Sequence, residues 1–376
     1  MAGLPYLQRV GAKPREFSAE NSRRQNCHDG GYAVFCPQNL EKGPLDACKG
    51  QRTLRAPMKS NGGSSFDNLA LEFVRVTEVA AIAAAAWIGK GDAKAADKAA
   101  VDAMRTQFNT IDFHGEIVIG EGAKDESHEL YIGEKLGLGT DPIVDIAVDP
   151  LECTDSVANG FPNALTVIAT GPKGSLYHAA DSYMEKLAVG PQAAGVVDLD
   201  APVSDTIKKV AHALGKEVSE IIVATLDRPR HEQLIAEARA AGARVRLFTD
   251  GDVAMALGTC LSRSSVDILM GTGGSSEAVL AAAAMRCLGG ELLCRWKPKD
   301  EKHVKRLNDA GVSDFSTIFK ASDLAKGDDI SFTATGVVSG PLADGVLFAA
   351  DHIVTHSVVM STHPRTVRFI NTKHMQ

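Results

Sequence analysis

The first part of the chain combines two helical patterns with short runs of β-type residues. Apolar residues recur at the spacing of one helix face over residues 67–89, and an alanine-rich stretch follows at 94–108. Short apolar, β-branched runs at 116–119, 143–148 and 165–169 predict strands. This part is therefore predicted to form an α/β region that begins with two helices.

After residue 190 helices and strands alternate regularly. The pattern predicts helices at 205–214, 231–241, 252–258 and 277–287, and strands at 220–224, 244–248 and 266–270. Such alternation favours a parallel-rich sheet covered by helices. We therefore expect an α/β protein with two regions, 66–190 and 191–372, that share a cleft.

Residues 1–65 follow neither pattern. They contain ten Lys or Arg, five Asp or Glu and eight glycines, and they end in the linker-like Ser-Asn-Gly-Gly-Ser-Ser. This composition predicts a flexible N-terminal extension. A basic leader is also typical of a transit peptide, which would direct the protein to a chloroplast or another plastid. If it is only a disordered tail, the cytoplasm is expected.

Composition excludes several classes of protein. In 376 residues, 44% are hydrophobic and 23% charged, as in ordinary soluble proteins. No run reaches the roughly 18–20 apolar residues of a membrane span. The net charge of −7 argues against nucleic-acid binding. The seven cysteines lack CxxC spacing, so free thiols are expected.

Acidic residues gather at the ends of the early elements. Asp149 ends an apolar strand, and Pro150 is expected to keep the chain extended and then to turn it, so that Glu152 points into the same site. Two close carboxylates repel unless a proton or a cation lies between them. Carboxylate oxygens suit Mg²⁺ or Mn²⁺. Glu121, from a Gly-Glu-Gly turn, and Asp97 would add enough charge for two or three ions.

A helix is predicted to start directly after Glu152, with Thr154 and Asp155 as capping residues. A helix N-terminus suits a phosphate group. Metals held by the carboxylates would lower the pKa of a water and neutralise phosphoryl oxygens. The pattern therefore favours phosphate-ester hydrolysis. The alternative is a set of solvated loop acids and caps.

Two later turns carry polar groups that suit a phosphorylated sugar. Arg228 and Arg230, held by Pro229, would form a rigid fork for a second phosphate, unless they are only a solvent-facing basic turn. The segment 250–252, Asp-Gly-Asp, would accept hydrogen bonds from sugar hydroxyls, or it is a capped turn.

The main rival interpretation comes from residues 271–277, Gly-Thr-Gly-Gly-Ser-Ser-Glu. A strand, a glycine-rich turn and a helix are typical of a dinucleotide site, but the full GxGxxG is missing. The turn would otherwise bring backbone N–H groups to a ligand, with Glu277 as a further acid. His352 and His356 are four apart but have no Glu partner, so they are interpreted as strand residues.

Taken together, these motifs resemble the class II, GlpX-type fructose-1,6-bisphosphatases and their fructose-1,6/sedoheptulose-1,7-bisphosphatase relatives. The resemblance runs from about residue 69 to residue 370. It is carried by segments 71–78, 99–105, 119–122, 144–150, 183–186, 228–231 and 250–254.

The resemblance implies a fold and an activity. The fold would be the layered αβαβα sugar-phosphatase fold of the lithium-sensitive phosphatase superfamily. The activity would be Mg²⁺- or Mn²⁺-dependent release of the 1-phosphate of fructose 1,6-bisphosphate, with sedoheptulose 1,7-bisphosphate as an alternative substrate. The role would be gluconeogenesis or the Calvin cycle, and the assembly a homodimer or homotetramer.

The resemblance also assigns roles to residues. Thr154 and Asp125 would be the catalytic, water-activating pair. The metal ligands would be Asp97, Glu121, Asp149, Glu152 and Glu277. The residues that bind the sugar and its distal phosphate would be Glu152, Cys153, Thr154, Tyr183, Arg228, Pro229, Arg230, Asp250, Gly251, Asp252 and Gly274.

Some positions depart from the family pattern. Cys153 stands where glycine is usual, Lys98 follows Asp97 in place of glycine, and Ser275-Ser276 replaces Ala-Pro. These changes leave two alternatives open: a weak or inactive sugar-phosphate-binding member of the fold, and a phosphatase for another sugar phosphate or an inositol phosphate.

Overall fold

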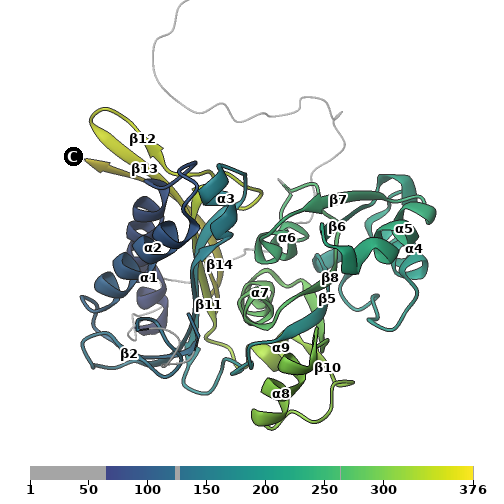
Figure 1. The fold of residues 1–376 in the computed structure, drawn as a ribbon, viewed down its shortest axis with the longest axis horizontal. Coiled ribbons are helices and arrows are strands. Elements are labelled where there is room, and N and C mark those ends of the chain that lie inside the picture. The colour runs from purple at the N-terminus through teal and green to yellow at the C-terminus, as the bar shows by residue number, and fades with distance from the viewer. Residues whose placement is uncertain (1–64, 123–127, 263, 376) are drawn as a thin grey trace, which may run out of the picture. The chain divides into compact units, whose positions relative to one another are not determined.

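The computed structural model of the chain describes residues 65–122, 128–262 and 264–375. These residues form two β-sheets with helices between and around them (Figure 1). The predictions for residues 1–64, including the transit peptide, and for Asp125 lie outside the described residues. None of the described helices is long and apolar enough to cross a membrane.

The first sheet has eight strands in the order β12-β13-β11-β4-β3-β1-β2, with β14 paired to β13. Its strands are β1 His114–Ile119, β2 Lys135–Leu136, β3 Ile143–Glu152, β4 Ala164–Pro172, β11 Ser331–Val338, β12 Leu347–Phe348, β13 His352–Thr362 and β14 Arg365–Met375. Among the described strands of this sheet, only β1 and β3 pair in parallel. The sheet therefore combines the three early predicted strands with a late, antiparallel part of the chain.

Helices α1 Ser65–Ala85 and α2 Ala93–Phe108 cover the outer face of this sheet. The Asp92 side chain accepts a hydrogen bond from the Ala95 amide (3.0 Å) and caps α2. Phe73 packs edge-on against Phe108 and Phe113, with ring centroids 5.4 and 5.2 Å away. Both predicted helices are confirmed, and α1 ends four residues early.

The second sheet has six strands in the order β10-β9-β5-β8-β6-β7. They are β5 Tyr183–Val189, β6 Ile222–Leu226, β7 Arg244–Phe248, β8 Ile268–Gly274, β9 Glu291–Trp296 and β10 Ile318–Lys320. Strands β7, β6 and β8 are parallel, as predicted. The expected parallel-rich sheet is only half correct, because β5, β9 and β10 pair antiparallel.

Helices complete a five-layered αβαβα arrangement (Figure 1). Helices α6 Asp252–Gly258 and α7 Ser275–Leu288 lie between the sheets, and α7 contacts both of them. Almost all of α7 is buried, which fits its apolar, alanine-rich sequence. Helices α4 Val203–Leu214 and α5 Glu232–Ala240 cover the outer face of the second sheet.

The shorter helices lie at the ends of strands. They are α3 Thr154–Asn159, α8 Glu301–Asp309, α9 Ala321–Leu324 and the 3-10 turns η1 Pro191–Ala193, η2 Val218–Glu220 and η3 Pro229–His231. The layered fold implied by the resemblance is thus confirmed, whereas a domain boundary at residue 190 stays a prediction.

Candidate active site

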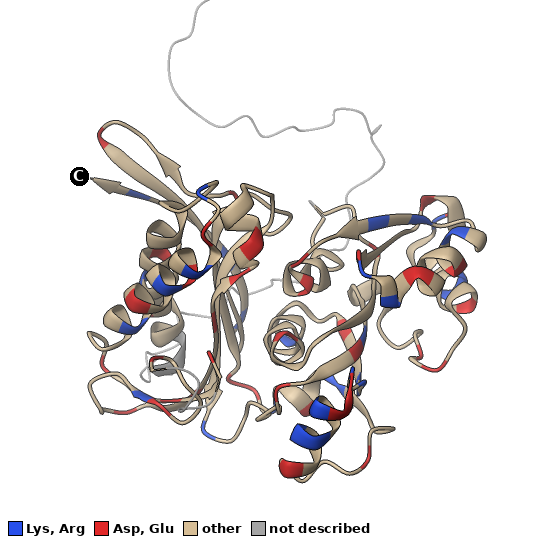
Figure 2. Ribbon diagram, in the orientation of Figure 1, with Lys and Arg blue, Asp and Glu red and all other residues tan. Residues whose placement is uncertain are grey.

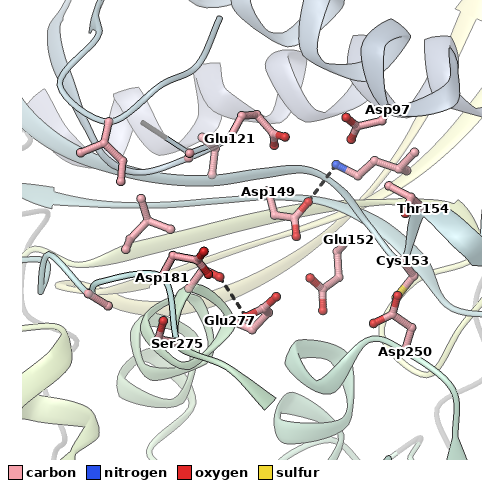
Figure 3. Close-up of a pocket in the computed structure, with 18 residues that line it drawn as sticks. Asp97, Glu121, Asp149, Glu152, Cys153, Thr154, Asp181, Asp250, Ser275 and Glu277 are labelled. Atoms are coloured by element: carbon pink, nitrogen blue, oxygen red, sulfur yellow. Dashed lines mark hydrogen bonds between the residues drawn. The ribbon is translucent and has the colours of Figure 1, made fainter. Parts of the chain in front are cut away.

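An acidic cavity of about 520 Å³ lies between the two sheets, where β1 and β3 end and α7 begins. All five predicted metal ligands line this cavity, and their carboxylates surround one space (Figure 3). They are Asp97 of α2, Glu121 after β1, Asp149 and Glu152 of β3, and Glu277 of α7. The structure therefore brings together acids that are up to 180 positions apart in the sequence.

A bulge in β3 places Asp149 and Glu152 on the same side of the sheet. Asp149 pairs with Val167 and Glu152 with Leu165, so three steps of β3 match two steps of β4. Without the extra residue, positions three apart would face opposite sides. Pro150 lies within the strand, so the chain is extended there as predicted, but β3 continues to Glu152 instead of ending at Asp149.

Asp149, Glu152 and Glu277 form the tightest part of the cluster. One oxygen from each of these carboxylates lies within 4.8 Å of the other two. Leu151 N–H donates to Asp149 (3.0 Å), and the Ser276 hydroxyl donates to Glu277 (2.9 Å), which orients both groups. Three convergent carboxylates, with oxygen donors only, fit a hard divalent cation.

Burial and mutual repulsion change the acidity of this cluster. Burial, assisted by Asp149 and Asp97, raises the pKa of Glu121 to about 8. Burial likewise raises the pKa of Asp149 to about 7, and it holds the pKa of Glu152 well above its usual value. Without a cation, the cluster therefore retains protons near neutral pH. A divalent cation would replace those protons as the compensating charge.

Helix α3 starts at Thr154, as predicted, but its cap differs. The N-cap is Cys153, with φ of 78°, and it makes no side-chain capping bond. Thr154 and Asp155 are the first helical residues rather than caps. With six residues, α3 is too short for its N-terminus alone to define a phosphate site. Of the predicted phosphate site at this helix start, the structure shows that Thr154 lines the acidic cavity.

A second cavity of about 240 Å³ adjoins the acidic one. The two share Glu152, Asp181, Asp250, Ser276 and Glu277 as lining residues. The second cavity also contains most of the predicted sugar-phosphate residues. These are Tyr183, Arg228, Arg230, Asp252 and Gly274.

The two arginines are held by backbone carbonyls, one just after β7 and one within β8. Arg228 Nη2 donates to Thr249 O (2.6 Å), and Arg230 Nη2 donates to Thr272 O (2.7 Å). The Arg230 guanidinium also lies 5.3 Å from the centroid of the Tyr183 ring. Pro229 begins η3 between them and is not among the lining residues. The predicted fork is therefore a pair of positioned guanidinium groups that line the second cavity.

Asp252 has a partner that the sequence did not suggest. Lys186, on β5, is buried and places its Nζ 2.6 Å from Asp252 Oδ2. The predicted role of Asp252 toward sugar hydroxyls is thus limited, because one of its oxygens is occupied. A lysine inside a strand pattern is ordinarily solvent-facing, so only the three-dimensional structure could reveal the pair.

Gly251 supports the site without lining either cavity. Its φ is 90°, and a Cβ there would lie 2.2 Å from Asn163 Nδ2 and 2.7 Å from Cys153 Sγ. Cys153 and Asn163 also have left-handed backbones, with φ of 78° and 71°. Asn163 Nδ2 donates to Asp250 O (3.3 Å). This contact, also missed from the sequence, holds the turn that carries Asp250.

A carboxylate-lined cavity in an αβαβα fold, beside two positioned arginines, is typical of a metal-dependent sugar phosphatase. A family model for bacterial fructose-1,6-bisphosphatase, glpX-encoded, matches residues 67–374. This chain therefore belongs to the GlpX-type, class II fructose-1,6-bisphosphatase family, and the resemblance found in the sequence is confirmed.

Curated relatives agree with the family model. The D-fructose 1,6-bisphosphatase class 2/sedoheptulose 1,7-bisphosphatase of Synechococcus sp. (strain JA-3-3Ab) is 43% identical over 336 residues, covering 83% of this chain and 97% of that protein. Fructose-1,6-bisphosphatase 1 class 2 of Escherichia coli (strain K12) is 43% identical over 318 residues, covering 81% and 95%. An inositol monophosphatase structure from Anabaena (Nostoc) sp. PCC 7120 aligns with a TM-score of 0.29 at 14% identity, over 53% of this chain and 73% of that one, too weakly to carry an argument.

Proposed function

We propose that this protein hydrolyses the 1-phosphate of fructose 1,6-bisphosphate, with sedoheptulose 1,7-bisphosphate as a second substrate. The observation that carries the proposal is the shared wall between a carboxylate-lined cavity and an arginine-bearing cavity. The first suits a phosphate bridged by cations, and the second suits a phosphate bound directly by guanidinium groups. A sugar with a phosphate at each end would occupy both.

The acidic cavity is the proposed reaction centre. Mg²⁺ or Mn²⁺ held by the five carboxylates would neutralise the phosphate oxygens and acidify a water. Glu152 is buried and Asp149 half-buried, and both are held by β3, which supplies the rigidity that such a site needs. Thr154, the first residue of α3, lines this cavity, and its hydroxyl is proposed to pass on a proton. Asp125, its proposed partner, is predicted from the sequence alone.

The second cavity is the proposed binding site for the rest of the substrate. Arg228 and Arg230 would hold the distal phosphate, and Asp250 would accept hydrogen bonds from sugar hydroxyls. The Tyr183 ring, beside Arg230, closes one side of the space. The names of the relatives favour this bisphosphatase function over an inactive binding protein or an inositol phosphatase. A homodimer or homotetramer is proposed as the assembly.

A phosphate-release panel tests the proposal. It compares fructose 1,6-bisphosphate, sedoheptulose 1,7-bisphosphate, fructose 1-phosphate and inositol 1-phosphate, each with Mg²⁺, with Mn²⁺ and with a chelator. We expect turnover of the bisphosphates only with a cation. Arg230→Gln should raise KM for the bisphosphates by about tenfold or more and leave that for fructose 1-phosphate unchanged. Arg239→Gln, on an exposed part of α5, is the matched control. Undiminished turnover in chelator would refute the proposal.

A further inference from the structure

His231 is a buried histidine to which the proposed function gives no role. It is the last residue of η3, the basic turn between β6 and α5 that also carries Arg230 (Figure 2). Its exposed fraction is only 3%. A buried imidazole needs a hydrogen-bond partner inside the protein for each ring nitrogen, because water does not reach it. The partners of His231 therefore indicate what the ring holds in place.

Both ring nitrogens of His231 have backbone partners, and these partners are on different strands. The Thr272 amide of β8 donates to Nε2 (2.8 Å), and Nδ1 lies 2.8 Å from Leu226 O at the end of β6. Because a backbone N–H can only donate, Nε2 has no proton, and the proton of the neutral ring is on Nδ1. Burial, assisted by Arg230 and Arg228, lowers the pKa of His231 and favours this neutral form.

The imidazole joins β6 and β8 where their own pairing has ended. The ladder between the two strands pairs residues 223–224 with 268–269, and both contacts of His231 lie beyond it. Gly271 makes room for the ring. Its φ is 145°, and a Cβ there would lie 3.1 Å from His231 Nε2. The glycine therefore allows the imidazole to approach the backbone of β8 closely.

Thr272 is the residue where His231 and Arg230 meet. The imidazole holds its amide, and its carbonyl accepts hydrogen bonds from Arg230 Nε (3.1 Å) and Nη2 (2.7 Å). Two neighbouring side chains of η3 thus hold both backbone polar groups of one residue. The position of the guanidinium consequently depends on a carbonyl whose residue is fixed by the imidazole.

We propose that His231 is a positioning residue for the distal phosphate, because it fixes Thr272 and thereby holds the Arg230 guanidinium in the second cavity. Arg230 lines that cavity and His231 does not, so the imidazole acts on a substrate only through its neighbour. The two bonds to Thr272 O leave Nη1 of Arg230 for a phosphate. A guanidinium that is already held loses less conformational freedom when the phosphate binds. The inference rests on the proposed function, which places the distal phosphate at Arg230.

Fructose 6-phosphate tests the inference, because it carries only the distal phosphate and its binding requires no turnover. Isothermal titration calorimetry of the full chain in chelating buffer measures its dissociation constant. We expect His231→Leu to raise this constant about tenfold, because Thr272 and with it Arg230 are no longer held. His212→Leu, the same change at an exposed histidine of α4, is the matched control and should leave the constant unchanged.

Two amide variants separate the two ring nitrogens and keep the buried position polar. In His231→Gln the amide oxygen reaches the place of Nε2 and can accept from Thr272, so the dissociation constant should stay within about threefold of wild type. Asparagine is shorter and reaches only the place of Nδ1, so His231→Asn should bind about as weakly as His231→Leu. Circular dichroism checks the fold of each variant. A histidine with only a packing role would not separate the two amides.

A double variant shows whether His231 acts through Arg230. In the Arg230→Gln background, His231→Leu should raise the dissociation constant by less than about twofold more, because the group that it positions is already gone. Full additivity of the two changes would overturn the inference, as would wild-type affinity of both His231→Leu and His231→Asn. Wild-type affinity of Arg230→Gln would instead refute the distal-phosphate site of the proposed function, and the inference with it.

Discussion

Two buried acids that line the second cavity, Asp252 and Glu152, differ in how their charge is compensated. Asp252 is 7% exposed and has Lys186, itself 3% exposed, at 2.6 Å. Glu152 is 3% exposed and faces Asp149 and Glu277, and no cationic side chain among the described residues pairs with it. An unpaired buried charge costs several kcal/mol. The comparison shows that the protein compensates one acid itself and leaves the other to a ligand.

The acidity of the two sites follows this difference. Burial lowers the pKa of Lys186, but Asp252 and Glu277 outweigh it and hold that pKa above its usual value, so the lysine is charged. Burial and the neighbouring acids raise the pKa of Glu152 well above its usual value, so its charge is favoured when a cation is present. Charge compensation, more than the presence of acids, therefore distinguishes the Lys186–Asp252 ion pair from the proposed metal site.

Glu152→Gln gives the largest expected effect. Turnover should fall on the order of a thousandfold, because a carboxylate that holds the cation becomes a neutral amide. In chelating buffer the same variant should unfold at higher urea concentration, since one of three crowded acids is gone. Steady-state kinetics and urea titration measure the two effects. Glu237→Gln, an exposed acid of α5, is the control, and wild-type turnover by Glu152→Gln would exclude the metal role.

Asp252→Asn should act on stability in the opposite direction. The change leaves the Lys186 ammonium buried without its counter-charge, which should lower the free energy of unfolding by roughly 3–5 kcal/mol. Adding Lys186→Met should recover most of this loss. Chemical denaturation with and without Mg²⁺ provides the measurement. If Asp252→Asn and Glu152→Gln shift stability the same way in chelator, the distinction between the two sites is lost.

Much of the fold could be predicted because local patterns were strong. The alternation after residue 190 predicted α4 to α7 and β6 to β8 closely. Strand β5 was missed because Glu185 and Lys186 interrupt its apolar pattern, although Lys186 is buried against Asp252. Strands β9 and β11 pair with β5 and β4, which are distant in sequence, and local periodicity does not reveal such pairs.

The site was predictable in its residue types and not in its geometry. Carboxylates after strands pointed to a cation site, and all five line one cavity. The bulge after Asp149 and the support of Gly251 by Asn163 depend on register and contacts between distant segments. Such contacts leave no local pattern, so the sequence did not predict that β3 continues to Glu152.

The metal-free protein should lose stability as pH rises. Glu121 and Asp149 have folded-state pKa values of about 8 and about 7, above their ordinary values of 4.5 and 3.8. Between about pH 4 and pH 8 the folded state binds more protons than the unfolded state, so the free energy of unfolding falls with pH, by on the order of a few kcal/mol. Saturating Mg²⁺ should remove most of this slope. Thermal melts from pH 5 to pH 9 measure it, and a rising curve in chelator would contradict the assignment.

Cys153→Gly should have the smallest effect, because its two contributions to the free energy of unfolding have opposite signs. Glycine relieves the left-handed backbone at φ of 78°, worth about 1 kcal/mol, but it removes the thiol that packs against the Gly251 turn. We expect the free energy of unfolding to change by less than about 1 kcal/mol and kcat by less than about threefold. Cys153→Ala separates the terms, since it loses the thiol and keeps the strain, and should be less stable than the glycine variant. If both variants are equally stable, backbone strain at this position is negligible, and the departure from the family's glycine costs the enzyme nothing.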